Sequence, residues 1–161
     1  MRIKTLGATA AAVVLTAIAG GAASGPSVNS PWYLQLRKPS YQPPREVFPI
    51  VWPALYGDIA LVSADTINRL SEDGRDETAR RFCAALAVNL GINAIWSWVF
   101  FNRHKLGLAA LPAGALTASS VDLTRRAVAV RQRRAAPLAA YPAWCAFATV
   151  LSTHIWWLNR R

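Results

Sequence analysis

Tryptophan is the residue that most marks this sequence as a possible ligand-binding chain. It occurs seven times in 161 residues, and Trp52, Trp96 and Trp144 fall in three different apolar segments. Large aromatic faces stack on flat apolar molecules and shield them from solvent. If the three segments pack together, the indoles are expected either to line one cavity or to act as packing residues. Trp156 and Trp157, at the end of the last apolar segment, are expected at a membrane interface.

Two asparagines share a predicted helical face with Trp96. Asn89, Asn93 and Trp96 follow one another at intervals of four and three residues, which places them on one stripe of a helix. Amide side chains within an apolar segment need hydrogen-bond partners. They either bridge neighbouring helices or donate hydrogen bonds to a ligand carbonyl or carboxylate, and the sequence leaves both possibilities open.

A carboxylate also lies within an apolar segment. Asp58 is near the middle of its segment, where an unpaired charge is costly, so we expect it to face the bundle interior in a protonated or paired form. A tyrosine hydroxyl, an asparagine amide or His154 would be a suitable partner. His154 itself is expected to be hydrogen-bonded and not a haem ligand. The sequence shows no catalytic triad, metal-ligand cluster or phosphate-binding loop, so we expect no enzyme, no metal and no cofactor.

These side chains must be positioned by helices that cross a membrane. Hydrophobic residues make up 53% of the chain and charged residues 16%, and the charges cluster between long apolar stretches. Helices satisfy their own backbone hydrogen bonds in lipid, and about 20 apolar residues suffice to span it. The sequence therefore predicts one domain over residues 1–161, an all-α integral membrane protein with a five-helix transmembrane bundle. The expected helices are approximately 6–25, 48–68, 82–101, 106–124 and 137–158.

The net charge of +10 is attributed to membrane interfaces and not to nucleic acid. The Lys and Arg residues border the apolar segments, where such residues set orientation and contact lipid headgroups, and no nucleic-acid-binding motif accompanies them. Eleven of the 18 lie on the side of the N-terminus and seven on the other side. The positive-inside rule therefore predicts a multi-pass protein with a cytoplasmic N-terminus.

Residues 25–47 form a proline-rich connection between the first two predicted spans. The connection contains five prolines together with Trp32, Tyr33 and Tyr41, which a plain linker would not need. These aromatic residues are expected either to anchor the connection at the lipid headgroups or to make it a lid over a cavity.

Three motifs, in chain order, resemble the TspO/translocator-protein family, also called tryptophan-rich sensory or peripheral-benzodiazepine-receptor-like proteins. The first covers residues 32–56 and reads WY-x-x-L-x-KP-x-Y-x-PP, followed by F-x-x-VW-x-x-LY. The second covers residues 92–101 and reads IN-x-x-WS-x-x-FF. The third consists of Tyr141, Pro142 and Trp144, in place of the familiar PY-x-x-W. Tyr41 departs from the family pattern, which usually has a tryptophan at that position.

The resemblance implies a receptor-like protein of a bacterial cell membrane that binds porphyrins, such as protoporphyrin IX, and other flat hydrophobic ligands. Its role would be regulatory or transport-related in tetrapyrrole metabolism or stress response. Alternatives are Trp-dependent photo-oxidative degradation of a porphyrin, and transport of a porphyrin or sterol. The family's C-terminal cholesterol-recognition motif is missing from this chain.

The resemblance also implies binding residues and partners. Membrane lipid and a second copy of the chain, in a homodimer, are the expected partners, and nucleic acid is not. The expected ligand-binding residues are Trp52, Asn93, Trp96, Trp144, Asn89, Tyr41, Ala148 and Leu151.

Overall fold

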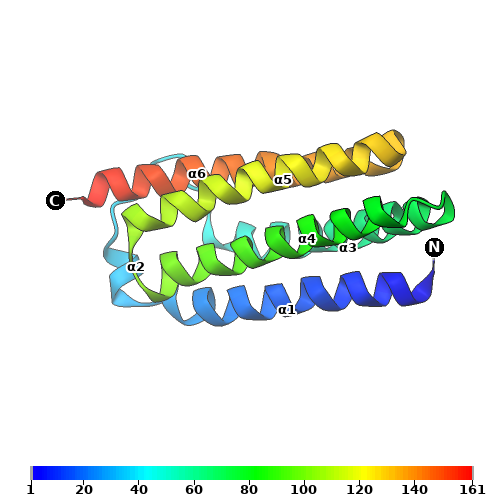
Figure 1. The fold of residues 1–161 in the computed structure, drawn as a ribbon. Coiled ribbons are helices and arrows are strands. Elements are labelled where there is room, and N and C mark those ends of the chain that lie inside the picture. Colours follow the sequence, from blue (N-terminus) through cyan, green and yellow to red (C-terminus); the bar gives the residue numbers. More distant parts are fainter. Residues whose placement is uncertain (1, 161) are drawn as a thin grey trace.

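The computed structural model describes residues 2–160, which form a bundle of five long helices. The long helices run side by side, and the two ends of the chain lie at opposite ends of the bundle (Figure 1). Helix α1 packs against α3 and α4, and α5 packs against α4 and α6. The elements are α1 Ile3–Ser27, α2 Pro31–Gln35, η1 Arg45–Val47, α3 Phe48–Glu72, α4 Asp76–Ser97, η2 Trp98–Asn102, α5 Leu106–Ala135, η3 Ala136–Ala139 and α6 Ala140–Asn159. The predicted five-helix fold is therefore confirmed within this range.

Large apolar side chains point outward along all five long helices. Examples are Leu15, Ile50, Val88, Leu111 and Val150, each more than half exposed. Soluble monomers rarely expose extended apolar surfaces, whereas lipid tails are a favourable surrounding for them. Within residues 2–160, four helical segments are long and apolar enough to cross a membrane, and the last of these contains both α5 and α6.

The turn between α3 and α4 follows from a single glycine. Gly74 has a φ of +69°, which glycine adopts without the steric penalty of a side chain. Its amide donates to the carbonyl of Ser71 at 3.2 Å, and the amide of Arg75 donates to the carbonyl of Leu70 at 2.8 Å. These two bonds form a Schellman motif, which ends α3 and lets α4 start at once.

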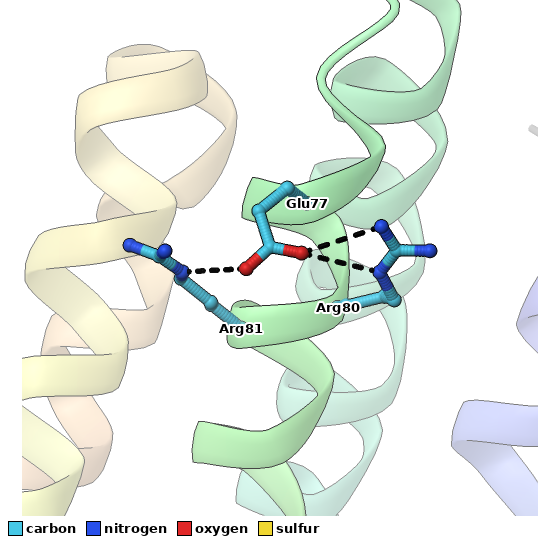
Figure 2. A network of polar contacts seen from close by, with 3 residues as sticks. All are labelled: Glu77, Arg80 and Arg81. Carbon is cyan, nitrogen blue, oxygen red and sulfur yellow. Dashed lines mark hydrogen bonds and ion pairs between the residues drawn. The ribbon is translucent and has the colours of Figure 1, made fainter.

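An ion-pair cluster lies at the start of α4. Figure 2 shows the Glu77 carboxylate between two guanidinium groups, with Arg81 Nε at 2.9 Å and Arg80 Nη2 at 3.3 Å. All three side chains are more than 60% exposed, so the pairs add little stability. Most of the charged segment 69–81 is thus helical. Helix α3 continues beyond its predicted span of 48–68, and α4 starts before its predicted span of 82–101 and ends at Ser97, where η2 follows.

Helix α5 differs most from its predicted span of 106–124. It continues through the arginine-rich stretch to Ala135, because residues 125–135 contain no glycine or proline and Ala and Arg favour helix. Membrane thickness limits only its apolar part. The backbone leaves helical geometry at Arg131, with φ −145° and ψ 75°, so α5 is kinked there. The turn η3 then reverses the chain into α6, which begins at Ala140 and not at 137.

The connection between α1 and α3 is held against the end of α6. Asn159 Nδ2 donates to the carbonyl of Arg37 at 2.9 Å, and its Oδ1 accepts from the Arg37 amide at 3.0 Å. The Tyr41 hydroxyl lies 3.0 Å from His154 Nδ1. The connection is therefore an ordered cover at the end of the bundle opposite the N-terminus (Figure 1).

Candidate functional site

A cavity of about 740 Å³ lies between α1, α3 and α4, with residues of α2 and η1 also in its wall. Its volume falls in the range of small-molecule sites, which are mostly apolar with a few polar groups. Its aromatic lining consists of Tyr33, Phe48, Trp52, Tyr56, Trp96 and Phe101. Its lining on α1 consists of small residues: Ala17, Gly20, Gly21, Ser24 and Gly25.

Trp52 and Trp96 form the aromatic wall of this cavity. Their ring centroids are 6.3 Å apart with an interplanar angle of 34°. Tyr56 lies 5.4 Å from Trp52, and Phe101 packs edge-on against Trp96 at 6.2 Å. On the α1 side, a Cβ added to Gly20 would lie 3.3 Å from Ser97 Oγ, so a larger residue there would crowd the α1–α4 contact. The wall pairs flat aromatic rings on α3 and α4 with small residues on α1.

A hydrogen-bond network borders the cavity and ties four helices together. Tyr56 Oη on α3 donates to Asn93 Oδ1 at 3.3 Å, and Asn93 Nδ2 donates to Tyr141 Oη on α6 at 3.2 Å. Tyr141 Oη donates to Asn89 Oδ1 at 2.9 Å, and Asn89 Nδ2 donates to Ser119 Oγ on α5 at 3.2 Å. Both asparagines therefore bridge helices. Asn93 also lines the cavity, whereas Asn89 does not appear in its wall.

Charged residues lie at the mouth of the cavity. Arg45 and Glu46 line it, and their side chains are 69% and 68% exposed. Arg45 Nε is 3.0 Å from Glu46 Oε1, and Arg45 Nη1 donates to Asn29 Oδ1 at 3.2 Å. An apolar chamber thus opens at a rim that carries an ion pair.

Lys38 contacts the cavity-lining residue Tyr33 through a hydrogen bond and a cation–π interaction. Lys38 Nζ donates to the Tyr33 carbonyl at 2.7 Å and lies 4.4 Å from the centre of its ring. Burial raises the pKa of the Tyr33 hydroxyl, which a hydrogen bond with Gln42 partly opposes, and burial lowers the pKa of Lys38. Tyr33 therefore stays uncharged at neutral pH and presents a neutral ring to the cavity.

The helical turn after α4 sets the direction of two neighbouring phenylalanines. Residues 98–102 form a π-turn, in which the amide of Arg103 donates to the carbonyl of Trp98 at 2.9 Å. Such wider turns are frequent at functional sites. Phe100 is 3% exposed and packs in a cluster with Leu151, whereas Phe101 lines the cavity.

The structure brings together only part of the predicted ligand-binding set. Trp52, Asn93 and Trp96 line the cavity. Trp144 is half-buried behind the wall and packs against the wall residue Phe48, with ring centroids 5.8 Å apart. The remaining predicted residues lie outside the wall: Tyr41 on the cover, Ala148 and Leu151 on α6, and Asn89 in the polar network.

Asp58 has no side-chain partner within residues 2–160. It is half-buried on α3, and within that range no hydrogen bond or ion pair joins it to a tyrosine, an asparagine or His154. Tyr56 bonds to Asn93, and His154 lies against Tyr41 on the cover. The expected pairing is therefore not formed with these groups. Within the same range, no cluster of His, Cys, Asp and Glu could hold a metal ion.

Sequence reasoning missed several wall residues as site residues. In the sequence, Tyr56 and Phe101 are motif positions only, and the glycines of α1 carry no sign of a binding role. A signal for Tyr56 exists, since it follows Trp52 by four residues and so shares its helical face. The α1 residues carry no such signal, because small residues have no chemistry of their own.

The aromatic wall, Asn93 and the proline-rich connection all belong to a part of the sequence that is similar to known proteins. The sequence matches one family over residues 8–158, nearly its full length. The chain belongs to the TspO/MBR family. Members of this family are membrane proteins with transmembrane helices, so the five apolar helices of this chain are those of an integral membrane protein.

Individual relatives of the TspO/MBR family agree with this assignment. Protein CrtK of Rhodobacter capsulatus is 36% identical over 97 residues, which cover 59% of this chain and 58% of the relative. The uncharacterized membrane protein YtaB of Bacillus subtilis is 30% identical over 92% of this chain and 94% of its own length. The human translocator protein is 30% identical over 78% of this chain and 73% of its own length. A further relative, from Cereibacter sphaeroides, is named tryptophan-rich sensory protein and is 37% identical over 48% of this chain and 45% of its own length.

Proposed function

We propose that this TspO/MBR protein is a membrane receptor-like binding protein for porphyrins and other flat hydrophobic molecules, with a regulatory or transport-related role in tetrapyrrole metabolism or stress response. The observation that carries the proposal is the 740 Å³ cavity with Trp52 and Trp96 in its wall. Two indole faces and two phenol rings offer a large flat apolar surface, which suits a macrocycle.

Polar groups of the wall would orient such a ligand. Trp96 Nε1 is buried and has no hydrogen-bond partner within residues 2–160, so it is a donor that a ligand acceptor could satisfy. The Asn93 side chain lines the same wall. An apolar molecule that carries a few hydrogen-bond acceptors would therefore bind this cavity more tightly than a pure hydrocarbon would.

Arg45 at the rim favours a ligand that carries carboxylates. Its guanidinium is exposed and pairs with Glu46 through Nε, so its Nη groups remain able to donate to a ligand carboxylate. Protoporphyrin IX combines a flat ring with two propionates, so its ring would occupy the aromatic cavity and a propionate would meet Arg45. A neutral sterol would leave this cation without a partner from the ligand.

The test is a titration of the detergent-purified protein with protoporphyrin IX, followed by porphyrin fluorescence anisotropy in the dark. Trp52→Leu is expected to weaken binding about ten-fold, since losing one stacked face removes about 0.5–1.5 kcal/mol beyond its buried area. The matched control is Trp157→Leu, because Trp157 is 53% exposed on α6 and outside the cavity. Equal weakening by both changes, or unsaturable binding to the wild type, would refute the proposal.

The same titration with the dimethyl ester of protoporphyrin IX tests the role of Arg45. Arg45→Gln is expected to weaken binding of the free acid several-fold and to leave binding of the ester unchanged. Illumination of the loaded protein then distinguishes the alternative function, because light-dependent breakdown would remove the porphyrin signal with time, whereas simple binding would not.

We further propose that the N-terminus faces the cytoplasm. The turn between α3 and α4 and the arginine-rich end of α5 lie at the same end of the bundle as the N-terminus (Figure 1). That end carries eleven of the 18 Lys and Arg residues. The positive-inside rule then places the cover and the mouth of the cavity on the outer side.

A further inference from the structure

A second concave site lies at the end of the bundle opposite the cover. It is an open depression of about 580 Å³ lined by Arg69 on α3 and by residues 130–134 at the end of α5. Three of those α5 residues are arginines: Arg131, Arg133 and Arg134. Four guanidinium groups therefore border one depression that is separate from the aromatic cavity.

The kink of α5 gathers these arginines. In a regular helix, Arg131 and Arg134 would share one face, whereas Arg133 would point about 160° away from Arg131 and about 100° away from Arg134. Arg131 instead has non-helical φ −145° and ψ 75°, and all three arginines line the same depression. Proximity of like charges is unfavourable unless anions compensate it.

The carboxylates nearby compensate only part of this charge. Asp65 lies 3.2 Å from Arg134 Nη1 and 3.7 Å from Arg131 Nε, and Asp73 lies 3.1 Å from Arg69 Nε. Arg133 has no ion-pair partner within residues 2–160. Four positive charges thus face two negative ones, which leaves an excess of two for an anionic ligand.

The position of the depression along the bundle corresponds to the headgroup layer of a membrane. Residues 106–129 of α5 span about 36 Å at 1.5 Å per residue, which exceeds the roughly 30 Å of hydrocarbon. Residues 130–134 therefore lie among the lipid headgroups. Basic pockets at this depth between transmembrane helices bind the phosphates of anionic lipids.

We propose that this depression is a binding site for the headgroup of an anionic phospholipid, held by Arg69, Arg131 and Arg133. The phosphate oxygens would accept the guanidinium N–H donors, and the acyl chains would extend along the apolar outer surface of the bundle. A lipid bound there would connect Arg131 and Arg133, at the kinked end of α5, to Arg69 on α3, beside the ion pair that Asp65 makes with Arg131.

The test is native mass spectrometry of the detergent-purified protein titrated with dioleoylphosphatidylglycerol or dioleoylphosphatidylcholine. The wild type is expected to retain one molecule of the anionic lipid preferentially. In the variant Arg131→Gln/Arg133→Gln, retention should fall about thirty-fold, since each basic residue near the membrane surface is worth about five-fold in affinity. Arg133→Gln alone disturbs no ion pair seen in the structure and should reduce retention about five-fold.

The control variant is Arg80→Gln/Arg81→Gln. It removes two positive charges at the same end of the bundle, from the Glu77 cluster outside the depression (Figure 2). Retention by this variant should equal that of the wild type. Equal loss in both double variants would mean general charge attraction and would overturn the site. So would equal retention of the two lipids, or displacement of the lipid by inorganic phosphate at the same concentration, which would identify free phosphate as the ligand.

Discussion

Tyr141 is the residue that joins the two buried asparagines. Its hydroxyl donates to Asn89 at 2.9 Å and accepts from Asn93 at 3.2 Å, and the side chain is fully buried. The two asparagines do not bond to each other. Asn93 also bonds to Tyr56 on α3 and Asn89 to Ser119 on α5, and Tyr141 supplies the partner that the two amides share. One phenol therefore gives partners to two polar groups that lipid could not satisfy.

Tyr141→Phe is expected to destabilise the bundle by about 1–3 kcal/mol, because it removes two interhelical hydrogen bonds that are each worth about 0.6–1.7 kcal/mol in membrane proteins. The measurement is the free energy of unfolding in mixed micelles, by titration with denaturing detergent. Tyr41→Phe is the control, since Tyr41 is 43% exposed on the cover and should change stability little. A Tyr141→Phe protein as stable as the wild type would show that these hydrogen bonds do not contribute to the free energy of unfolding.

The packing of α5 on α6 depends on a glycine near the start of α5. A Cβ added to Gly107 would lie 2.8 Å from Trp156 Nε1 and 3.2 Å from two of its ring carbons. This approach is closer than side chains normally tolerate, so Trp156 lies directly over the glycine. Gly114, two turns later, has no atom within 4 Å of such a Cβ.

Gly107→Ala is expected to displace Trp156 and to destabilise the protein by about 1–3 kcal/mol, the usual cost of overpacking. Gly114→Ala should be neutral or slightly stabilising, because alanine favours helix and meets open space. Thermal unfolding in detergent, with tryptophan emission as the second readout, distinguishes the two variants. If Gly107→Ala also proved neutral with unchanged emission, the close α5–α6 contact at this position would be disproved.

At the scale of the whole molecule, the two proposed binding sites lie at opposite ends of the bundle. The cover lies at one end of the bundle, while the turn between α3 and α4 and the end of α5 lie at the other (Figure 1). Residues of the cover line the aromatic cavity, and residues at the end of α5 line the arginine depression. Between the ends, the outer surface is apolar on all five long helices. The proposed porphyrin and lipid sites therefore belong to opposite membrane faces.

This separation predicts opposite labelling of two single cysteines. In a background of Cys83→Ser and Cys145→Ala, Ser40→Cys on the cover should react with a membrane-impermeant maleimide from outside intact cells. Thr78→Cys at the start of α4 should react only after the cells are opened. Both parent side chains are exposed, so accessibility is governed by the membrane alone. The reverse pattern would contradict the cytoplasmic placement of the N-terminus.

The sequence by itself determined the helical fold, the membrane class and the family. Apolar segments of membrane length admit few structures other than helices, and helical spacing placed Asn93 and Trp96 on one face. The FxxVWxxLY and INxxWS motifs contain Trp52 and Trp96, which both line the cavity. The same spacing also placed Asn89 on this face, although the structure shows it in the polar network.

Only the tertiary structure decided which faces meet. Periodicity shows the buried side of a helix but not the neighbour that covers it, so Trp144 could not be separated from the wall residues in advance. The kink at Arg131 also had no sequence signal, because no glycine or proline marks it. The cavity combines small residues of α1 with aromatic residues of α3 and α4, and the depression combines Arg69 of α3 with residues 130–134 of α5. These residues are distant in sequence, so only the packing of the helices brings them together.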